Sequence, residues 1–243
     1  MIMARKNLSE SIEQQQYFET VAVPAVPEEG TRDLGPLAPF LISGGTNTER
    51  YYFTHINDTT DYKFNIFPKY FGNESSYTDI FPERIKDIIK NNPGAKIFCV
   101  FDMDTVFRNE TNQGKHHTFE NNLKQEIANG SVVLCPSMPS IEYWFLLHFE
   151  NRTQLIKTCG KTMQKLLEPY MLPYFPNSNG KRLLNILKSE EFVKAPDWVV
   201  KLCENDKLDD AIKRAEKNIT DADANGDSKQ HSYSYLYKVF KKD

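Results

Sequence analysis

The stretch that decides the fold of this chain is Lys96-Ile97-Phe98-Cys99-Val100-Phe101-Asp102-Met103-Asp104. An unbroken apolar run of this length is typical of a strand that is buried on both faces, as in parallel sheets. Two carboxylates follow at positions i and i+2, and alternation along a strand would point both side chains the same way. Ligands of open α/β sheets bind at the carboxyl ends of the strands. We therefore expect Asp102 and Asp104 to share a hard cation at this edge of a sheet.

Short apolar runs and helical periodicity alternate along the middle of the chain. Strands are predicted at residues 40–42, 62–71, 95–101 and 131–135. Helices are predicted at residues 51–56, 80–91, 118–129 and 140–149. Strands that alternate with helices in this way build a parallel sheet with helices on its faces. The pattern therefore predicts an α/β fold.

The two ends of the chain differ from this middle part. Residues 1–36 combine a polar, helix-like stretch at 8–19 with a segment, 23–30, in which Pro and Gly prevent regular structure. Towards the other end, only helical patterns are strong. We expect an accessory N-terminal segment over residues 1–36, an α/β core over residues 37–152 and a helical C-terminal extension over residues 153–243.

Composition limits the classes of function. The chain has 243 residues and a net charge of −3, so nucleic acid could be bound only through local basic patches. Its four scattered cysteines argue against a disulfide framework or a cysteine zinc site and fit a reducing, cytoplasmic compartment. The sequence has no apolar run of about 20 residues, so we expect no membrane-spanning segment. A homo-oligomer is compatible with this composition.

One family pattern that fits the aspartates belongs to the haloacid-dehalogenase phosphatases. Asp102-Met103-Asp104-Thr105 resembles their Asp-x-Asp-x-Thr/Val signature, in which the first Asp is the nucleophile and the second the general acid beside Mg²⁺. Ser137 could supply the Ser or Thr that this class also needs. The late acidic pair, Asp209-Asp210, lies in a helical pattern rather than after a strand, and the signature follows the third predicted strand instead of the first.

A second family pattern suits the order of the strands better. Toprim domains, the metal-dependent fold of topoisomerases, primases and overcoming-lysogenization-defect nucleases, carry a Glu after the first strand and an Asp-x-Asp after the third. Within that class, three blocks of the chain resemble the RloB family. They are Phe40-Leu41-Ile42-Ser43-Gly44-Gly45-Thr46-Asn47-Thr48-Glu49-Arg50-Tyr51-Tyr52-Phe53, Phe101-Asp102-Met103-Asp104 and Ser137-Met138-Pro139-Ser140-Ile141-Glu142-Tyr143-Trp144-Phe145-Leu146-Leu147-His148-Phe149. The third block is the most specific, and the likeness covers about residues 40–240.

The resemblance implies a Toprim-like parallel sheet flanked by helices and a nuclease that acts on DNA or RNA in bacterial defence against phage. Asp102 and Asp104 would hold Mg²⁺ or Mn²⁺, and Glu49 and Glu142 would be supporting ligands or bases. The resemblance also implies an ATPase partner protein. Without it, two aspartates after a strand could simply cap a loop and the next helix.

The chain departs from the family at one position. The usual opening is Glu-Gly-x-x-Thr-Glu-x-x-Tyr-Phe, and Gly44 stands where the first Glu belongs. That Glu is the presumed acid/base or metal-linked group of Toprim enzymes. An alternative is therefore a catalytically degenerate module that binds a partner or a phosphorylated ligand without cleaving it.

Other candidate residues surround these motifs. Glu142 lies on an otherwise apolar helix, where a buried carboxylate needs a partner or a cation. Arg108 and Lys115 belong to a polar segment, expected to be a loop over residues 108–118, and could contact phosphates. His148 is a candidate for substrate binding and, equally, for a hydrogen-bonded structural histidine.

Overall fold

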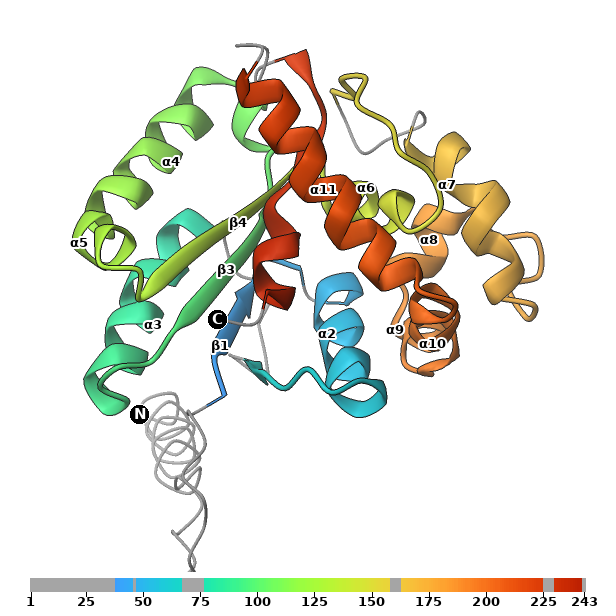
Figure 1. Cartoon of the computed structure of the whole chain (residues 1–243), viewed down its shortest axis with the longest axis horizontal. Helices are drawn as coiled ribbons and strands as arrows, with labels where there is room; N and C mark the ends of the chain where they lie inside the picture. Colours follow the sequence, from blue (N-terminus) through green and yellow to red (C-terminus); the bar gives the residue numbers. More distant parts are fainter. Residues whose placement is uncertain (1–37, 46, 67–76, 158–162, 225–229, 242–243) are drawn as a thin grey trace, which may run out of the picture. The chain divides into compact units, whose positions relative to one another are not determined.

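The computed structural model of this protein describes residues 38–45, 47–66, 77–157, 163–224 and 230–241. Residues 37–243 form one compact unit. Figure 1 shows its strands and helices. The expected N-terminal segment, residues 1–36, and the helix-like stretch within it lie outside the described residues.

The described residues contain a five-stranded sheet in the order β2-β1-β3-β4-β5. Its strands are β1 (Phe40–Ser43), β2 (Asn65–Ile66), β3 (Ile97–Asp102), β4 (Val132–Met138) and β5 (Tyr233–Ser234). The first four run parallel, and β5 pairs antiparallel with β4. The expected α/β class with a mostly parallel sheet is confirmed.

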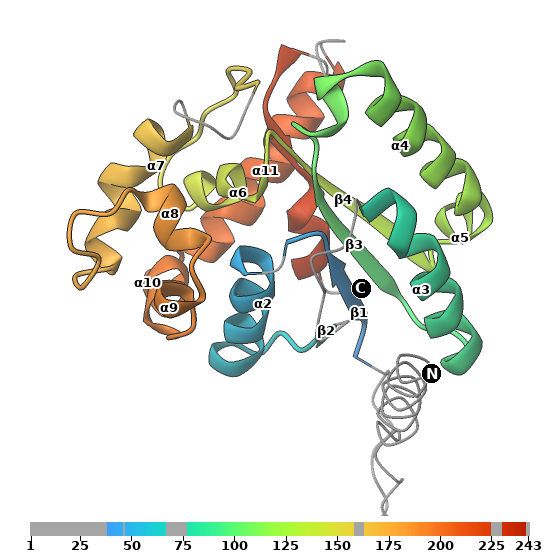
Figure 2. The ribbon, with the colours of Figure 1, turned by 180° about the vertical axis from the view of Figure 1, so that it is seen from behind.

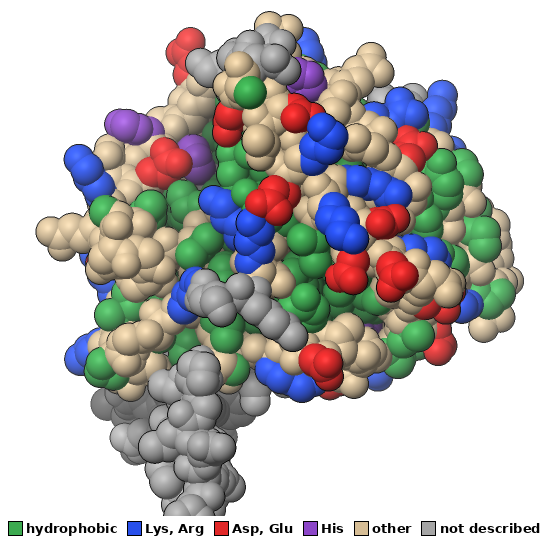
Figure 3. Space-filling model, in the orientation of Figure 1, with side chains coloured by type: hydrophobic (Ala, Val, Ile, Leu, Met, Phe, Trp, Pro, Cys, Tyr) green, Lys and Arg blue, Asp and Glu red, His purple; other side chains and the backbone are tan. Residues whose placement is uncertain are grey.

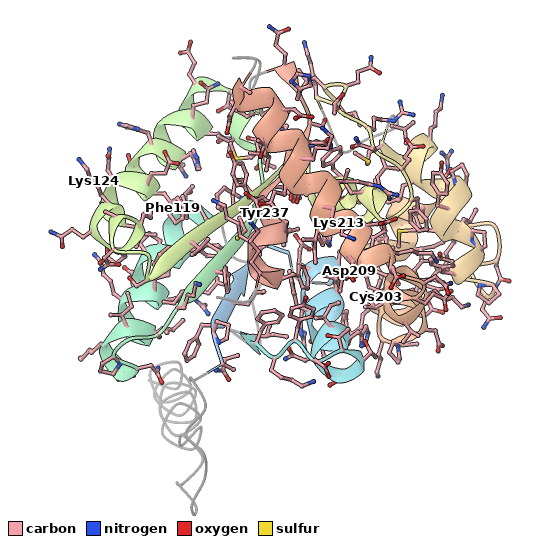
Figure 4. All side chains as sticks on the ribbon, in the orientation of Figure 1. Phe119, Lys124, Cys203, Asp209, Lys213 and Tyr237 are labelled. Carbon is pink, nitrogen blue, oxygen red and sulfur yellow. The ribbon has the colours of Figure 1, made fainter. Side chains whose placement is uncertain are left out.

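Helices cover both faces of this sheet, because its central strands are apolar on both sides. Alternation sends Phe98 and Val100 of β3 towards one face, and Ile97, Cys99 and Phe101 towards the other. The first face carries α2 (Thr48–Thr59), α6 (Ile141–Leu147), α11 (Lys207–Ala224) and η5 (Tyr235–Phe240). The second carries α3 (Tyr77–Asn91), α4 (Glu110–Asn122) and α5 (Lys124–Ala128). Figure 4 marks Phe119 of α4 and Tyr237 of η5 on either side of β3 and β4.

The chain after residue 153 adds helices to the first face. These elements are α7 (Gln164–Met171), η3 (Leu172–Tyr174), α8 (Leu183–Leu187), α9 (Glu190–Val193) and α10 (Asp197–Cys203). Trp198 of α10 packs against Tyr52 of α2 and Phe145 of α6, with ring centroids 6.1 and 5.6 Å away. The expected helical extension is therefore continuous with the core rather than a separate body.

The last part of the chain also returns to the sheet, which the sequence pattern did not predict. The short strand β5 pairs with β4, and Ser137 and Ser234 hydrogen bond through their hydroxyls at 2.8 Å. The ring of Phe240 stacks on buried Trp144 at 5.4 Å and an interplanar angle of 5°. Two strand residues are too few to leave a periodic signal, so only the tertiary contacts define this strand.

Two local expectations differ from the structure. The expected loop at 108–118 is instead η1 (Val106–Arg108) followed by α4, whose first turn is capped by the Asn109 side chain accepting from the Asn112 N–H at 2.9 Å. Apolar periodicity could not predict the start of this helix, because Phe119 is the only one of its described residues that is buried. The strand expected at 62–71 is seen as Asn65–Ile66, and residues 67–71 lie outside the described part.

The part of the chain that the structure describes has no helix with the length and apolar character needed to cross a membrane.

Candidate functional site

Three carboxylates from separate elements meet at the carboxyl ends of the central strands. Glu49 lies in the first turn of α2, Asp102 is the last residue of β3, and Glu142 lies in the first turn of α6. Figure 2 shows α2 and α6 beginning beside the ends of β1 and β4. Two adjoining cavities, of about 410 and 370 Å³, share Glu49 and Asp102 as walls, and Glu142 lines the smaller one. We call these joined spaces the carboxylate cavity.

Asp102 is held by backbone groups from the segment that follows β4. Its Oδ1 accepts a hydrogen bond from the Ile141 N–H at 3.0 Å. The N–H groups of Met103 and Asp104 both donate to the Pro139 carbonyl oxygen, at 3.1 and 3.0 Å. The turn after β3 is therefore fastened to the start of α6, which keeps Asp102 close to Glu142.

Glu142 is buried on an apolar helix and has a local partner. It is 7% exposed, and its Oε2 accepts a hydrogen bond of 2.5 Å from the hydroxyl of Ser140, which is itself 1% exposed. The two residues are separated by one position, so the Ser-x-Glu spacing of the third motif places the hydroxyl beside the carboxylate. This contact orients Glu142 through a neutral hydroxyl, which adds no positive charge beside the carboxylate.

Burial and mutual repulsion make the site electrostatically unusual. Burial raises the pKa of Glu49 to about 7; a backbone hydrogen bond opposes the shift, and the charge of Glu142 adds to it. The pKa of Asp102 lies well above its ordinary value, first because of burial and then because of the charges of Glu49 and Glu142. The described site is therefore a place where added positive charge is favourable.

Lys188 is a site residue that sequence reasoning missed. It lines the carboxylate cavity from the end of α8, and its charge lowers the pKa of Glu49. The Asn47 side chain donates to the Lys188 carbonyl oxygen at 2.7 Å, and the Thr48 hydroxyl donates to the Leu187 carbonyl oxygen at 2.9 Å. No sequence motif marks Lys188, because its place depends on the docking of α8 against α2.

Gly45 makes room for the carboxylate of Glu49. A Cβ atom added at Gly45 would lie 1.6 Å from Oε2 of Glu49, which is close to the length of a covalent bond and far inside van der Waals contact. The second glycine of the Gly44-Gly45 pair is therefore required wherever Glu49 adopts this position. This gives a physical reason for the Gly in the first motif.

Asp104 does not share the cavity that Asp102 lines. The strand β3 ends at Asp102, so alternation no longer governs Asp104, which lies in the following turn. Asp104 instead lines a neighbouring pocket of about 880 Å³. Its charge still adds to the raised pKa of Asp102, so the two carboxylates interact without facing the same space.

The expected phosphate-binding residues lie at the rim of the site. Arg108 and Lys115 are exposed and line the larger part of the carboxylate cavity, together with Thr105 and Asn112. The Asn112 side chain donates to the Thr105 carbonyl oxygen at 2.7 Å and ties α4 to the turn after β3. This contact brings the basic residues of η1 and α4 beside Asp102.

The structure gives His148 a core position instead of the expected substrate contact. It is 2% exposed, and its Nδ1–H donates to the Trp144 carbonyl oxygen at 2.9 Å. Burial lowers its pKa to about 3, so the ring is neutral at physiological pH. Its place in the third motif is explained by packing against Trp144, whose ring lies 5.1 Å away.

The side chains of the site offer the kind of ligand atom that a hard divalent cation prefers. Glu49, Asp102 and Glu142 offer carboxylate oxygens, which are the ligands that Mg²⁺ takes from proteins. Among the described residues, no group of three or more His, Cys, Asp or Glu side chains is already gathered tightly enough to hold a metal ion. These side chains would therefore have to draw together around a cation.

The late acidic pair of the phosphatase pattern lies elsewhere. Asp209 and Asp210 belong to α11, and Asp210 accepts from the Arg214 guanidinium at 2.9 Å. Figure 4 marks Asp209 on this helix. Neither residue lines the carboxylate cavity, so the structure offers no support for the phosphatase interpretation.

The fold and site together define an α/β protein of Toprim-like architecture, with an acidic cluster at the carboxyl ends of its parallel strands. The family model of the RloB-like proteins matches residues 40–242. The chain belongs to this RloB-like family, as the three sequence blocks indicated. No curated protein and no solved structure matches the chain.

Proposed function

We propose that this protein is a Mg²⁺- or Mn²⁺-dependent nuclease that hydrolyses phosphodiester bonds of DNA or RNA. The observation that carries the proposal is the meeting of Glu49, Asp102 and Glu142, from three separate elements, at the end of a parallel sheet. Burying carboxylates side by side is costly unless positive charge compensates them. A bound metal ion would provide that compensation.

Glu49, Asp102 and Glu142 would hold the ion, and Asp104 would add negative charge from the neighbouring turn. When bound, the metal would neutralise charge on the scissile phosphate and lower the pKa of an attacking water. Without a cation, burial raises the pKa of Glu49 to about 7, and a bound cation would favour the ionised form that acts as a ligand. Glu49 would thereby offer the site a carboxylate where Gly44 no longer supplies the family Glu.

Local cations would recognise the substrate phosphates. Arg108, Lys115 and Lys188 all line the carboxylate cavity. On the face seen in Figure 3, Lys and Arg side chains are interspersed with Asp and Glu instead of forming one basic surface. Recognition would thus be concentrated around the site, in keeping with the net charge of −3.

Family membership is the support for the biological setting of this activity. We propose that the protein acts in the cytoplasm of bacteria as part of a defence against phage, together with an ATPase partner. The ATPase would supply sensing and gating, and the present chain would supply the cleavage site.

The test is a nuclease assay with single- and double-stranded DNA and RNA in the presence of Mg²⁺ or Mn²⁺. Asp102→Asn retains an oxygen that can accept from the Ile141 N–H, so the variant should fold and lose activity by at least about 100-fold. Asp209→Asn, on α11, is the matched control and should remain active. Equal cleavage by Asp102→Asn and the unchanged protein would show that the activity is not its own.

A degenerate binding module is the second candidate, and Gly44 is the residue that favours it. In that case the protein binds nucleic acid or a phosphorylated ligand but cleaves nothing with either metal. Gly44→Glu, which restores the family residue, should then create metal-dependent cleavage. If the unchanged protein cleaves and Asp102→Asn does not, the degenerate module is ruled out.

A further inference from the structure

A larger pocket, of about 880 Å³, lies beside the carboxylate cavity. Its walls come from η1, β5 and the last turns of α11, the helix that ends at the top of the view in Figure 1. Its walls include Asp104, Phe107, Arg108, Asn218, Tyr233 and Tyr235. Small ligands bind in spaces of this size. Most of this wall has no part in the proposed cleavage chemistry.

Aromatic rings form much of the wall of this pocket. Phe107 is 55% exposed, and Tyr233 and Tyr235 lie with ring centroids 5.7 Å apart and planes at 76°. A single exposed Phe is ordinary on a protein surface. Here it shares a concave wall with two tyrosines, and aromatic rings of this kind are the surfaces on which nucleobases stack.

A buried amide in the same wall is only partly hydrogen bonded within the described residues. Asn218 is 4% exposed, and its amide NH₂ donates to the Tyr143 hydroxyl at 3.3 Å. That hydroxyl uses its own hydrogen to donate to the Arg152 carbonyl oxygen at 2.6 Å, so the amide must face it through nitrogen. Among the described residues, nothing donates to Oδ1 of Asn218. This oxygen is itself buried, so an amino or ring N–H group of a base would reach it only after the Asn218 side chain turns towards the pocket.

Arg108 connects the pocket with the carboxylate cavity, because it lines both. Lys157, an exposed residue of the pocket wall, is a second cation there. A base in the pocket would therefore carry its phosphate towards Arg108 and onwards to Glu49 and Asp102. Aromatic walls for a base and a shared cation for its phosphate together suit one nucleotide in chemistry.

We propose that this pocket binds one unstacked base of a single-stranded nucleic acid, whose adjoining phosphate is held by Arg108. The inference rests on the proposed function for its substrate class. It adds that single-stranded or locally opened substrate is required, since a base inside a duplex cannot leave its stack without cost.

Binding can be measured apart from cleavage. The full chain is titrated, in EDTA, into fluorescein-labelled single strands of DNA of about eight nucleotides, and anisotropy is recorded. A second strand of equal length is wholly abasic and so keeps the phosphates while losing every base. Phe107→Ala should weaken binding of the base-containing strand by about tenfold and leave the abasic strand unaffected. Arg108→Gln should weaken the binding of both strands.

Tyr170→Ala is the matched control, because Tyr170 is 36% exposed and stacks on Phe149 away from the pocket. It should bind both strands as the unchanged protein does. Unaltered binding by Phe107→Ala, or equally weakened binding to both strands, would contradict the proposed binding of a base in this pocket.

This test does not depend on the nuclease proposal, because EDTA removes the metal that cleavage requires and only binding is measured. Cleavage in the presence of Mg²⁺ or Mn²⁺, without base-dependent binding in EDTA, would refute only the proposed binding of a base in the pocket. Base-dependent binding that Phe107→Ala weakens, without any cleavage, would support the pocket and refute the nuclease.

Discussion

At the scale of single residues, the site depends on a glycine as much as on its acids. Gly45 leaves the space that the Glu49 carboxylate occupies, and any side chain there must push the carboxylate aside. Glu49 is flexible, so it can move at little cost in stability. The position of a catalytic oxygen can therefore be changed without unfolding the protein.

Gly45→Ala should keep its thermal stability and lose metal-dependent cleavage by about 100-fold, because small misplacements of reacting groups cost this much. Gly114→Ala is the control, since a Cβ atom at Gly114 meets nothing within 4 Å. It should retain full activity and gain up to about 1 kcal/mol in helix stability. Thermal melting and initial cleavage rates measure both effects. An active Gly45→Ala would mean that Glu49 is not needed where it lies.

Glu49 also makes stability depend on pH. Its pKa rises from 4.5 in the unfolded chain to about 7 in the folded one, so the folded state binds more protons between these values. Its contribution to stability is fully present below about pH 4.5 and is lost as pH rises through 7. At pH 8 this loss is of the order of 3 kcal/mol.

Glu49→Gln, measured in EDTA, should therefore lose less stability than the unchanged protein between pH 5 and pH 8. Asp102 keeps its own raised pKa, so some pH dependence should remain in the variant. The free energy of unfolding in urea, determined at several pH values, gives the comparison. Parallel curves for the two proteins would contradict the assigned pKa.

At the scale of elements, the site requires α8 to dock against α2. The side chains of Asn47 and Thr48 donate to the carbonyl oxygens of Lys188 and Leu187, at the end of α8. These bonds satisfy backbone groups that a helix end leaves open. They also set the position of the Lys188 side chain in the carboxylate cavity.

Thr48→Val should lower the free energy of unfolding by about 1–2 kcal/mol, because it leaves the buried Leu187 carbonyl oxygen without its donor. Oligonucleotide affinity should fall as well, since Lys188 loses its fixed position. The control is Thr54→Val, which removes a hydrogen bond to the Arg50 carbonyl oxygen inside α2. Urea unfolding and anisotropy measure the two effects. Equal behaviour of both variants would show that the docking contact is unimportant.

At the scale of the whole molecule, the segments before and after residue 153 share one core. Trp144 and Phe145 are fully buried, and they contact Phe240 and Trp198 from the end of the chain. Each such side chain contributes about 2 kcal/mol or more by burial. The expected boundary between residues 152 and 153 therefore crosses a continuous hydrophobic cluster.

Residues 37–152 expressed alone should fail to fold cooperatively, whereas residues 37–243 should melt in one transition. Exposure of the α6 aromatic residues is the physical reason. Circular dichroism and binding of a hydrophobic dye distinguish the two fragments. A sharp thermal transition of the shorter fragment would establish an independent domain.

Local pattern was enough to predict the α/β class, the central strand and three carboxylates of the site. Each of these depends on neighbouring residues: an apolar run for β3, and short motifs around Glu49, Asp102 and Glu142. Family membership followed from the same motifs. The site metal and the nuclease activity stay predictions.

What only the tertiary structure decided involves residues that are distant in sequence. Asp104 lines a different pocket from Asp102, because β3 ends at Asp102 and strand alternation no longer applies two residues later. Lys188, the strand β5 and the two tyrosines of the aromatic pocket lie more than 80 residues from the Asp-x-Asp motif. A sequence pattern records which face of its own element a residue occupies. Which other element covers that face depends on the packing of the whole core.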